Sequence, residues 1–157
     1  MKGETMSEIE RLVEELRQAF AGPAWHGPAV REVLADVNPE RAASRPLANA
    51  HSIWEIALHI ATWEDVVRRR LAGEVIDDLP DEQDWPAVRD ASADAWQHTL
   101  QLLERTNLAL RNAMARLETA ELTGTVPGKS YSVYVMLQGV IQHDVYHAGQ
   151  IALLKKA

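Results

Sequence analysis

The sequence predicts an all-α fold, a four-helix bundle with one additional short helix. Between clusters of glycine and proline, apolar residues recur with the three-and-four spacing of helices that bury one face. No stretch alternates apolar and polar residues as a half-buried strand does. The chain of 157 residues is long enough to enclose a sizeable core, and we expect one domain over residues 1–157.

Composition excludes several classes of function. The formal charge of −7 is opposite to the clustered positive charge that nucleic-acid binding needs. No apolar run approaches the ~20 residues that span a bilayer, and no apolar signal segment follows the N-terminal methionine. Because the chain has no cysteine, disulfides, thiolate nucleophiles and cysteine-ligated metals are ruled out. We therefore expect a cytoplasmic protein that binds neither nucleic acid nor membranes.

The first long helix is predicted from Ser7 to Ala21. Ser7 and Glu10 form a capping-box pattern at its start, and Gly22-Pro23 ends it. Pro28 suits the first turn of a short helix, which Asn38-Pro39 stops. We expect the next segment, residues 40–50, to be a polar connection without a helix.

The second long helix begins with another capping box, Ser52 and Glu55, and runs to Ala72. Its buried stripe consists of apolar residues at helical spacing, with His59 and Trp63 within or beside it. The last turn carries three consecutive basic residues, which complement the negative end of the helix dipole. These residues are Arg68, Arg69 and Arg70.

An acidic segment, residues 74–84, separates the second helix from the third. It contains no lysine or arginine, and we interpret it as a solvated loop that flanks the entry to a site. The third long helix starts near Trp85-Pro86 or at Ser92 and ends near Leu117. Trp96 and later apolar residues recur there every seven positions, which is typical of the seam of a bundle. The four long helices predict an antiparallel bundle, and the connection of about thirty residues between the first two permits a crossed order.

The last helix, predicted from Tyr131 to Lys156, carries the most informative pattern. His143 and His147 are four residues apart, so they lie one turn apart on the same helix face. They fill gaps in the apolar stripe of that helix, and both rings are therefore expected to face the core. Buried imidazoles need partners for their nitrogens, because burying an unpaired polar group costs free energy.

A divalent metal ion would satisfy these rings. His59 supplies a third inward histidine from another helix, and three neutral imidazoles with an open position are typical of catalytic sites of zinc or nickel. The sequence therefore predicts a metal site formed by His59, His143 and His147. The nearest polar residues that could orient the rings are Asp144, Gln150 and Glu64. The alternative is that each histidine is a core residue bonded to a backbone carbonyl.

Other metal chemistries fit less well. The pattern His143-Asp144-x-x-His147 is similar to the zincin motif, but aspartate replaces its glutamate and only ten residues follow. A ferritin-like di-iron site needs paired Glu-x-x-His motifs, and the last helix has no glutamate. Haem held by two histidines stays open. Of the other histidines, His51 is expected to brace the loop or the start of the second helix, and His26 and His98 are expected in a loop and on the surface.

Two segments together resemble the DinB/YfiT-like superfamily. They are residues 52–64, which contain His59-Ile60-Ala61, and residues 142–151, which contain the two later histidines followed by Gly149-Gln150. The resemblance implies a four-helix bundle with a crossed helix order and often a homodimer. It also implies a site of three histidines for nickel, zinc or another divalent ion, whose ligands correspond to His59, His143 and His147. Characterised relatives include thiol transferases and isomerases that use low-molecular-weight thiols.

Two functions follow as hypotheses. The first is a metal-dependent enzyme, either a hydrolase or a thiol transferase acting on a small molecule, in which the metal activates a bound water or thiol. The second is a non-catalytic homodimeric metal-binding or stress-linked scaffold protein, which predicts no cavity at the metal. A third, weaker hypothesis is a metal-free protein that binds small molecules. The sequence does not identify the catalytic residues or the substrate.

Overall fold

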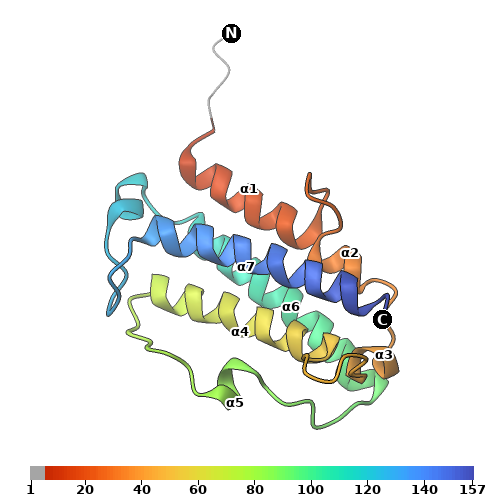
Figure 1. Cartoon of the computed structure of the whole chain (residues 1–157). Helices are drawn as coiled ribbons and strands as arrows, with labels where there is room; N and C mark the ends of the chain where they lie inside the picture. Colours follow the sequence, from red (N-terminus) through yellow and green to blue (C-terminus); the bar gives the residue numbers. More distant parts are fainter. Residues whose placement is uncertain (1–5) are drawn as a thin grey trace.

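The computed structural model describes residues 6–157 and confirms the all-α prediction (Figure 1). Helices account for all regular structure of that part of the chain, apart from one isolated bridge between Thr125 and Ser132. The long helices are α1 (Glu8–Ala21), α4 (Ile53–Leu71), α6 (Ala93–Met114) and α7 (Val133–Leu154). The short ones are α2 (Val30–Leu34), α3 (Pro39–Ala43), α5 (Asp81–Asp84) and the 3-10 helix η1 (Thr119–Thr123).

The predicted capping boxes form at the starts of α1 and α4. The Ser52 hydroxyl accepts a hydrogen bond from the Glu55 backbone N–H, and the Glu55 carboxylate accepts one from the backbone N–H of Ser52. Ser7 and Glu10 make the same reciprocal pair at α1. These caps satisfy backbone donors that have no partner within the helix, which explains why both helices begin where the sequence predicts.

The connections contain more helix than the sequence predicts. Asn38-Pro39 begins the short helix α3, because the Asn38 side chain caps it and proline suits its first position. The expectation of a polar connection without a helix over residues 40–50 was therefore wrong at its start. The acidic segment is likewise not entirely loop, because α5 forms at its end. Of the two predicted starts for the third long helix, the later is correct, with Ser92 as the cap of α6.

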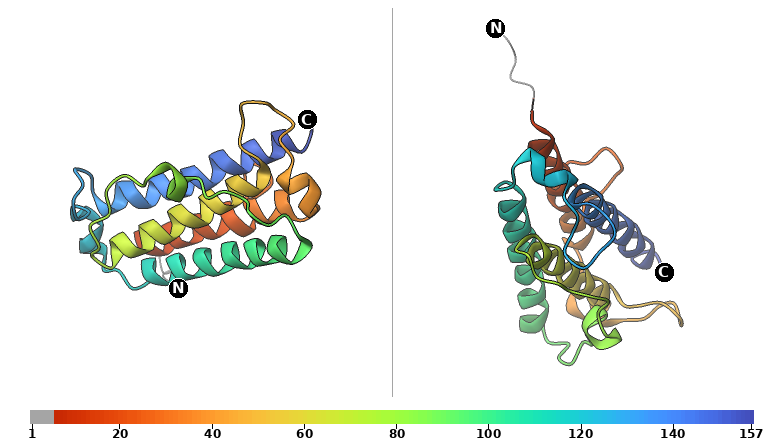
Figure 2. Two further views of the ribbon diagram at one scale, coloured as in Figure 1. Left: turned by 90° about the horizontal axis from the view of Figure 1, so that it is seen from below. Right: turned by 90° about the vertical axis from the view of Figure 1, so that its left-hand side faces the viewer.

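The four long helices pack in a crossed order around a shared core. Both α1 and α4 pack mainly against α6 and α7, so consecutive long helices α1 and α4 lie diagonally across the core (Figures 1 and 2). The chain directions differ from a fully antiparallel bundle: α4 runs parallel to α6 and antiparallel to α7, and α1 runs parallel to α7 (Figure 1). The long connection from α4 to α6 permits the parallel pair, because it returns the chain to the end where α4 begins (Figure 2).

Contacts between named residues agree with these directions. Trp54 near the start of α4 bonds Thr99 near the start of α6, whereas Arg70 at the end of α4 bonds Tyr131 just before α7. In the described part of the chain, no helix is both long enough and apolar enough to cross a membrane. The inward faces of α4 and α7 meet between the two buried apolar clusters of the core, and this is where the candidate site lies.

Candidate metal centre

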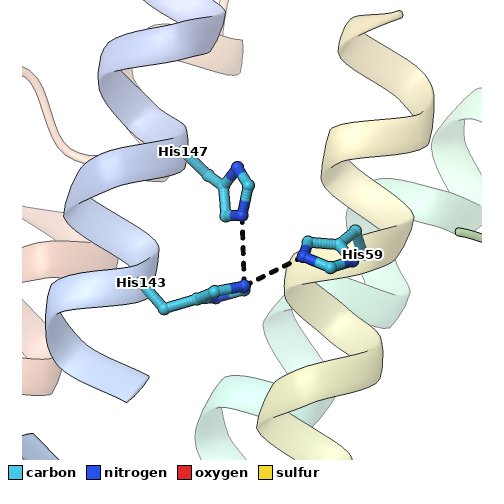
Figure 3. Close-up of side chains that lie close together, drawn as sticks. All are labelled: His59, His143 and His147. Atoms are coloured by element: carbon cyan, nitrogen blue, oxygen red, sulfur yellow. Dashed lines mark hydrogen bonds between the residues drawn. The ribbon is translucent and has the colours of Figure 1, made fainter. Parts of the chain in front are cut away.

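Three histidines from two helices meet at one point between α4 and α7. His143 Nε2 lies 3.0 Å from His59 Nε2 and 3.1 Å from His147 Nε2 (Figure 3). The three ligand atoms all lie within 4.8 Å of one another, in an arrangement that could hold a metal ion. The helix repeat places His143 and His147 on one face of α7, and α4 brings His59 opposite them (Figure 3). The structure thus brings together the three residues that the sequence singles out; that they bind metal stays a prediction.

Two of the rings are oriented through their other nitrogen. His59 Nδ1 lies 2.6 Å from the backbone carbonyl oxygen of Asp84, and His147 Nδ1 lies 2.6 Å from the side-chain oxygen of Gln150. Both neighbours are acceptors, so the ring proton resides on Nδ1 and the Nε2 lone pair is directed at the centre of the cluster. This is the arrangement found around metal-ligating histidines.

The donor set suits a cation better than it suits three interacting rings. His143 Nε2 lies next to His59 Nε2 and His147 Nε2, and both of these atoms carry a lone pair. If His143 Nε2 carried a proton, this single N–H could bond only one of the two lone pairs at a time. A divalent ion would accept all three lone pairs. Three ligands at about 2.0–2.1 Å in tetrahedral geometry are separated by about 3.3 Å, close to the two separations found here. The residues present therefore fit a metal ion.

The electrostatic environment keeps the rings uncharged. Burial lowers the pKa of His143 and of His147 to about 4, and the neighbouring His143 ring adds to the effect at His147. Burial also lowers the pKa of His59, although the bond to the Asp84 backbone opposes this shift. Neutral imidazole is the form that ligates metals, so all three rings are in a binding-competent state at neutral pH.

An aromatic stack covers one face of the His59 ring, and Trp85 in this stack also lies 6.0 Å from the His147 ring. The Trp85 ring lies parallel to the His59 ring with centroids 3.8 Å apart, and His51 stacks on the other side of Trp85 at 3.6 Å. Asp84 makes a further contact with α4, because its carboxylate accepts a hydrogen bond from Trp63 Nε1 at 2.7 Å. The end of the acidic segment is thus held against α4 and positions a ring of the site.

Sequence reasoning missed Asp84 and Trp85 as site residues. Asp84 contacts His59 through its backbone carbonyl, which carries no side-chain signature, and its carboxylate lies 3.2 Å from His59 Nδ1. Trp85 contacts His59 through its ring, from a segment 26 residues away in the chain. One signal was present: Trp85 is a large apolar residue at the end of a polar, acidic segment and needs an apolar neighbour. His51 braces this region, as predicted, by stacking on Trp85. His26 and His98 are both exposed and lie outside the cluster.

The three polar residues that the sequence proposes as ring partners have different positions. Gln150 contacts His147 directly, and its amide donates to Tyr146. Asp144 lies on the Nδ1 side of His143, 3.8 Å from that atom, and is fully buried. Glu64 contacts none of the three rings in the described structure.

Asp144 and Glu64 form a buried pair of carboxyls behind the cluster. Glu64 accepts hydrogen bonds from Thr106 and from Asn107, whose own side-chain oxygen accepts one from Arg111. Burial raises the pKa of Asp144 to about 7, and burial together with the nearby Asp144 charge raises that of Glu64 well above its usual range. Because Asp144 is buried on the Nδ1 side of His143, it does not occupy the position of the zincin base.

Two cavities reach the cluster from opposite directions. The Trp63 cavity, of about 270 Å³, ends at His143, and the Trp85 cavity, of about 340 Å³, ends at His147. The Trp63 cavity is lined by Trp63, Val67, Arg70, Tyr131, Val135, Met136, Gly139, Val140 and His143. The Trp85 cavity is lined by Leu47, Asn49, Ala50, His51, Ile56, Trp85, Tyr146, His147, Gln150, Leu153 and Leu154. A small molecule could therefore approach the cluster.

Comparison with known proteins identifies the family. No curated protein and no solved structure matches the chain significantly. The family model of the DinB superfamily matches residues 24–151, a span that contains α2 to α6, most of α7 and all three histidines. This span exceeds half of the 157 residues, and it agrees with the resemblance of the two histidine-containing segments. The chain belongs to the DinB superfamily.

Proposed function

We propose that this protein is a divalent-metal-dependent enzyme in which His59, His143 and His147 hold the ion, with nickel or zinc as the metal. The observation that carries the proposal is the convergence of three neutral imidazole nitrogens at a point that two cavities reach. When bound, such an ion supplies Lewis acidity and lowers the pKa of a water or thiol ligand, which suits hydrolysis or transfer of a low-molecular-weight thiol.

The chain's own residues would contribute orientation and exclusion of water. Asp84 and Gln150 hold the Nδ1 protons of two rings, so that their Nε2 lone pairs face the ion without rearrangement. The Trp85 ring covers one face of His59 and keeps water from that side. Three protein ligands leave a position open for substrate, as catalytic sites require.

The cavities favour this proposal over a structural metal site. A structural site is closed by four protein ligands and needs no access, whereas this cluster contains three candidate ligands and lies at the ends of two cavities. The alternative of a non-catalytic scaffold predicts no cavity at the metal. A closed site would support the scaffold alternative, and the two cavities at the cluster therefore argue against it.

Metal content is the measurement that tests the proposal. Protein purified without a histidine tag or chelator should contain close to one equivalent of nickel or zinc, and the His143→Ala variant should lose it. The matched control is His98→Ala, which removes an exposed histidine of α6 and should retain the metal. Wild-type protein that is metal-free and does not bind added divalent ions with micromolar affinity would overturn the proposal.

Catalysis is tested on the loaded protein. Ester and amide substrates, and small thiols paired with electrophiles, should include at least one reaction that requires both the metal and His143. Turnover that is the same in wild type and in His143→Ala would argue against a role of the cluster in the reaction.

We also propose that the protein acts as a homodimer, as the family resemblance implies, and that it is cytoplasmic, as its composition predicts. Tyr146 and Leu153 lie two turns apart on α7, and both large side chains are more than half exposed in the single chain. Apolar residues of this kind are typical of contacts between subunits. Light scattering should give the mass of two chains, and Leu153→Lys should reduce it if this face forms the contact.

A further inference from the structure

The three consecutive arginines at the end of α4 have different surroundings. Arg68 pairs with Asp65 at 2.7 Å, and Arg69 pairs with Glu74 at 2.7 Å. Arg70 is only 5% exposed, and no carboxylate of residues 6–157 lies within ion-pair distance of it. The helix dipole explains a basic last turn, but it does not explain why one of these charges is buried without an opposite charge.

Neutral groups hold the Arg70 guanidinium in place. Its Nη1 donates to the Tyr131 hydroxyl at 3.1 Å, and its Nη2 donates to the backbone carbonyl of Ile76 at 2.8 Å. The guanidinium lies over the Trp63 ring, 5.7 Å from the centroid. Nε has no hydrogen-bond partner among the described residues. These contacts leave a full positive charge uncompensated, which is costly in a buried position.

This charge lies at the end of the Trp63 cavity that is remote from the histidines. Arg70 and Tyr131 line the cavity at that end, and His143 lines it at the other. Along α4, the cavity-lining residues Trp63 and Arg70 are seven residues apart, which corresponds to about 10 Å of helix, and the Trp63 ring lies 6.3 Å from the His143 ring. The cavity wall between Arg70 and His143 is mainly apolar, with Val67 and Val140 among its residues.

We propose that the Trp63 cavity binds an elongated substrate that has a carboxylate at one end and an apolar middle. The carboxylate lies at the Arg70 guanidinium and the Tyr131 hydroxyl, the middle contacts Val67 and Val140, and the reacting end lies at His143. The identity of the reacting end rests on the function proposed above, whereas the preference for a carboxylate rests on Arg70 alone.

The chemistry of arginine favours a carboxylate over a neutral group. A guanidinium presents planar N–H donors that match the two oxygens of a carboxylate, and charge-assisted bonds of this kind are about twice as strong as neutral ones. The chain as a whole carries a charge of −7, so attraction of an anion to this cavity has to be local. A purely structural Arg70 predicts that the cavity binds charged and neutral molecules of the same shape equally well.

The test compares matched probes on wild-type protein. Phenylalkanoates with chains of two to six carbons and their primary amides have the same shape and differ in charge. Calorimetric titration should show that, for at least one chain length, the carboxylate binds at least about tenfold more tightly than the amide. The titrations are made on both metal-loaded and metal-free protein, because a carboxylate could also ligate the metal.

Variants locate the source of the preference. Arg70→Met should abolish the preference while leaving the affinity for the amide unchanged, and Arg70→Lys should retain part of it. Arg68→Met removes the same charge two positions earlier in α4, outside the Trp63 cavity, and should retain the full preference. If Arg70→Met does not fold, Val135→Glu at an exposed position of the cavity wall should weaken binding of the carboxylate but not of the amide.

The outcomes separate this inference from the proposed function. A preference that persists in metal-free protein and disappears in Arg70→Met supports the inference, even if the purified protein contains no metal. Equal affinities for acid and amide at every chain length overturn it. A preference that requires the metal and survives in Arg70→Met also overturns it, because the carboxylate then binds the ion.

Discussion

The backbone carbonyl oxygen of Asp84 lies 2.6 Å from Nδ1 of His59, a residue 25 positions earlier in the chain. This contact joins the acidic connection between α4 and α6 to the histidine cluster. It sets the tautomer of His59, because a carbonyl can only accept a hydrogen bond. The connection is therefore part of the candidate metal centre.

Trp85 should matter for metal affinity although it offers no ligand. Its ring stacks on His59 and holds the adjacent Asp84 carbonyl in place. We expect Trp85→Ala to weaken zinc or nickel binding by about tenfold to a hundredfold, the usual effect of losing support around a ligand. Competition with a chelator measures the affinity, and circular dichroism checks the helices. Trp25→Ala, which removes a fully exposed tryptophan, should leave the affinity unchanged.

Gln150 should also contribute to metal affinity, because it orients the His147 ring. Its side-chain oxygen accepts the Nδ1 proton of that ring, and Gln150→Ala removes the acceptor. We expect metal affinity to fall by about tenfold to a hundredfold. Gln142→Ala on the exposed face of α7 is the matched control and should have no effect. Unchanged affinity in Gln150→Ala would mean that packing alone orients His147.

Metal binding should persist to an unusually low pH. Protons compete with the ion for Nε2, and the pKa values of His143 and His147 are lowered to about 4. The pKa of His59 is lowered as well, so the apparent affinity should be constant at neutral pH, begin to fall only below the ordinary histidine pKa and fall most steeply as the pH approaches about 4. A chelator competition repeated over a series of pH values measures this. Half of the affinity already lost near 6.5, the ordinary pKa of histidine, would contradict the prediction.

Asp144 should reduce the stability of the metal-free protein as the pH rises. Its pKa is raised to about 7 by burial, so its contribution is fully present below the unfolded-state pKa of about 3.8 and is lost as the pH rises through about 7. Asp144→Asn cannot ionise. Relative to wild type, this variant should gain stability between pH 5 and pH 8, by an amount on the order of a few kcal/mol.

Urea denaturation of both proteins at the two pH values measures this difference. The histidine titrations are common to both proteins, so the difference reports the ionisation of the buried pair Asp144 and Glu64. A stability difference that is the same at pH 5 and pH 8 would show that replacing Asp144 does not change the ionisation of this pair in that range.

Local features of the chain were predictable from the sequence. The spacing of His143 and His147 places them on one helix face, because the helix repeat is a property of the backbone. Ser7 and Ser52 mark helix starts, since their side chains bond to donors only three residues away. That the histidines face inward followed from the apolar stripe around them.

Other features depend on contacts between distant parts of the chain. Examples are the approach of Asp84 to His59, the separation of Arg70 from every carboxylate of residues 6–157, and the diagonal placement of α1 and α4. The sequence by itself determined the helices, their caps and the face on which each histidine lies, because hydrogen bonds and side-chain spacing within a few residues control them. Only the tertiary structure decided which connection covers the cluster and which arginine is buried, because packing of segments far apart in the chain selects those contacts.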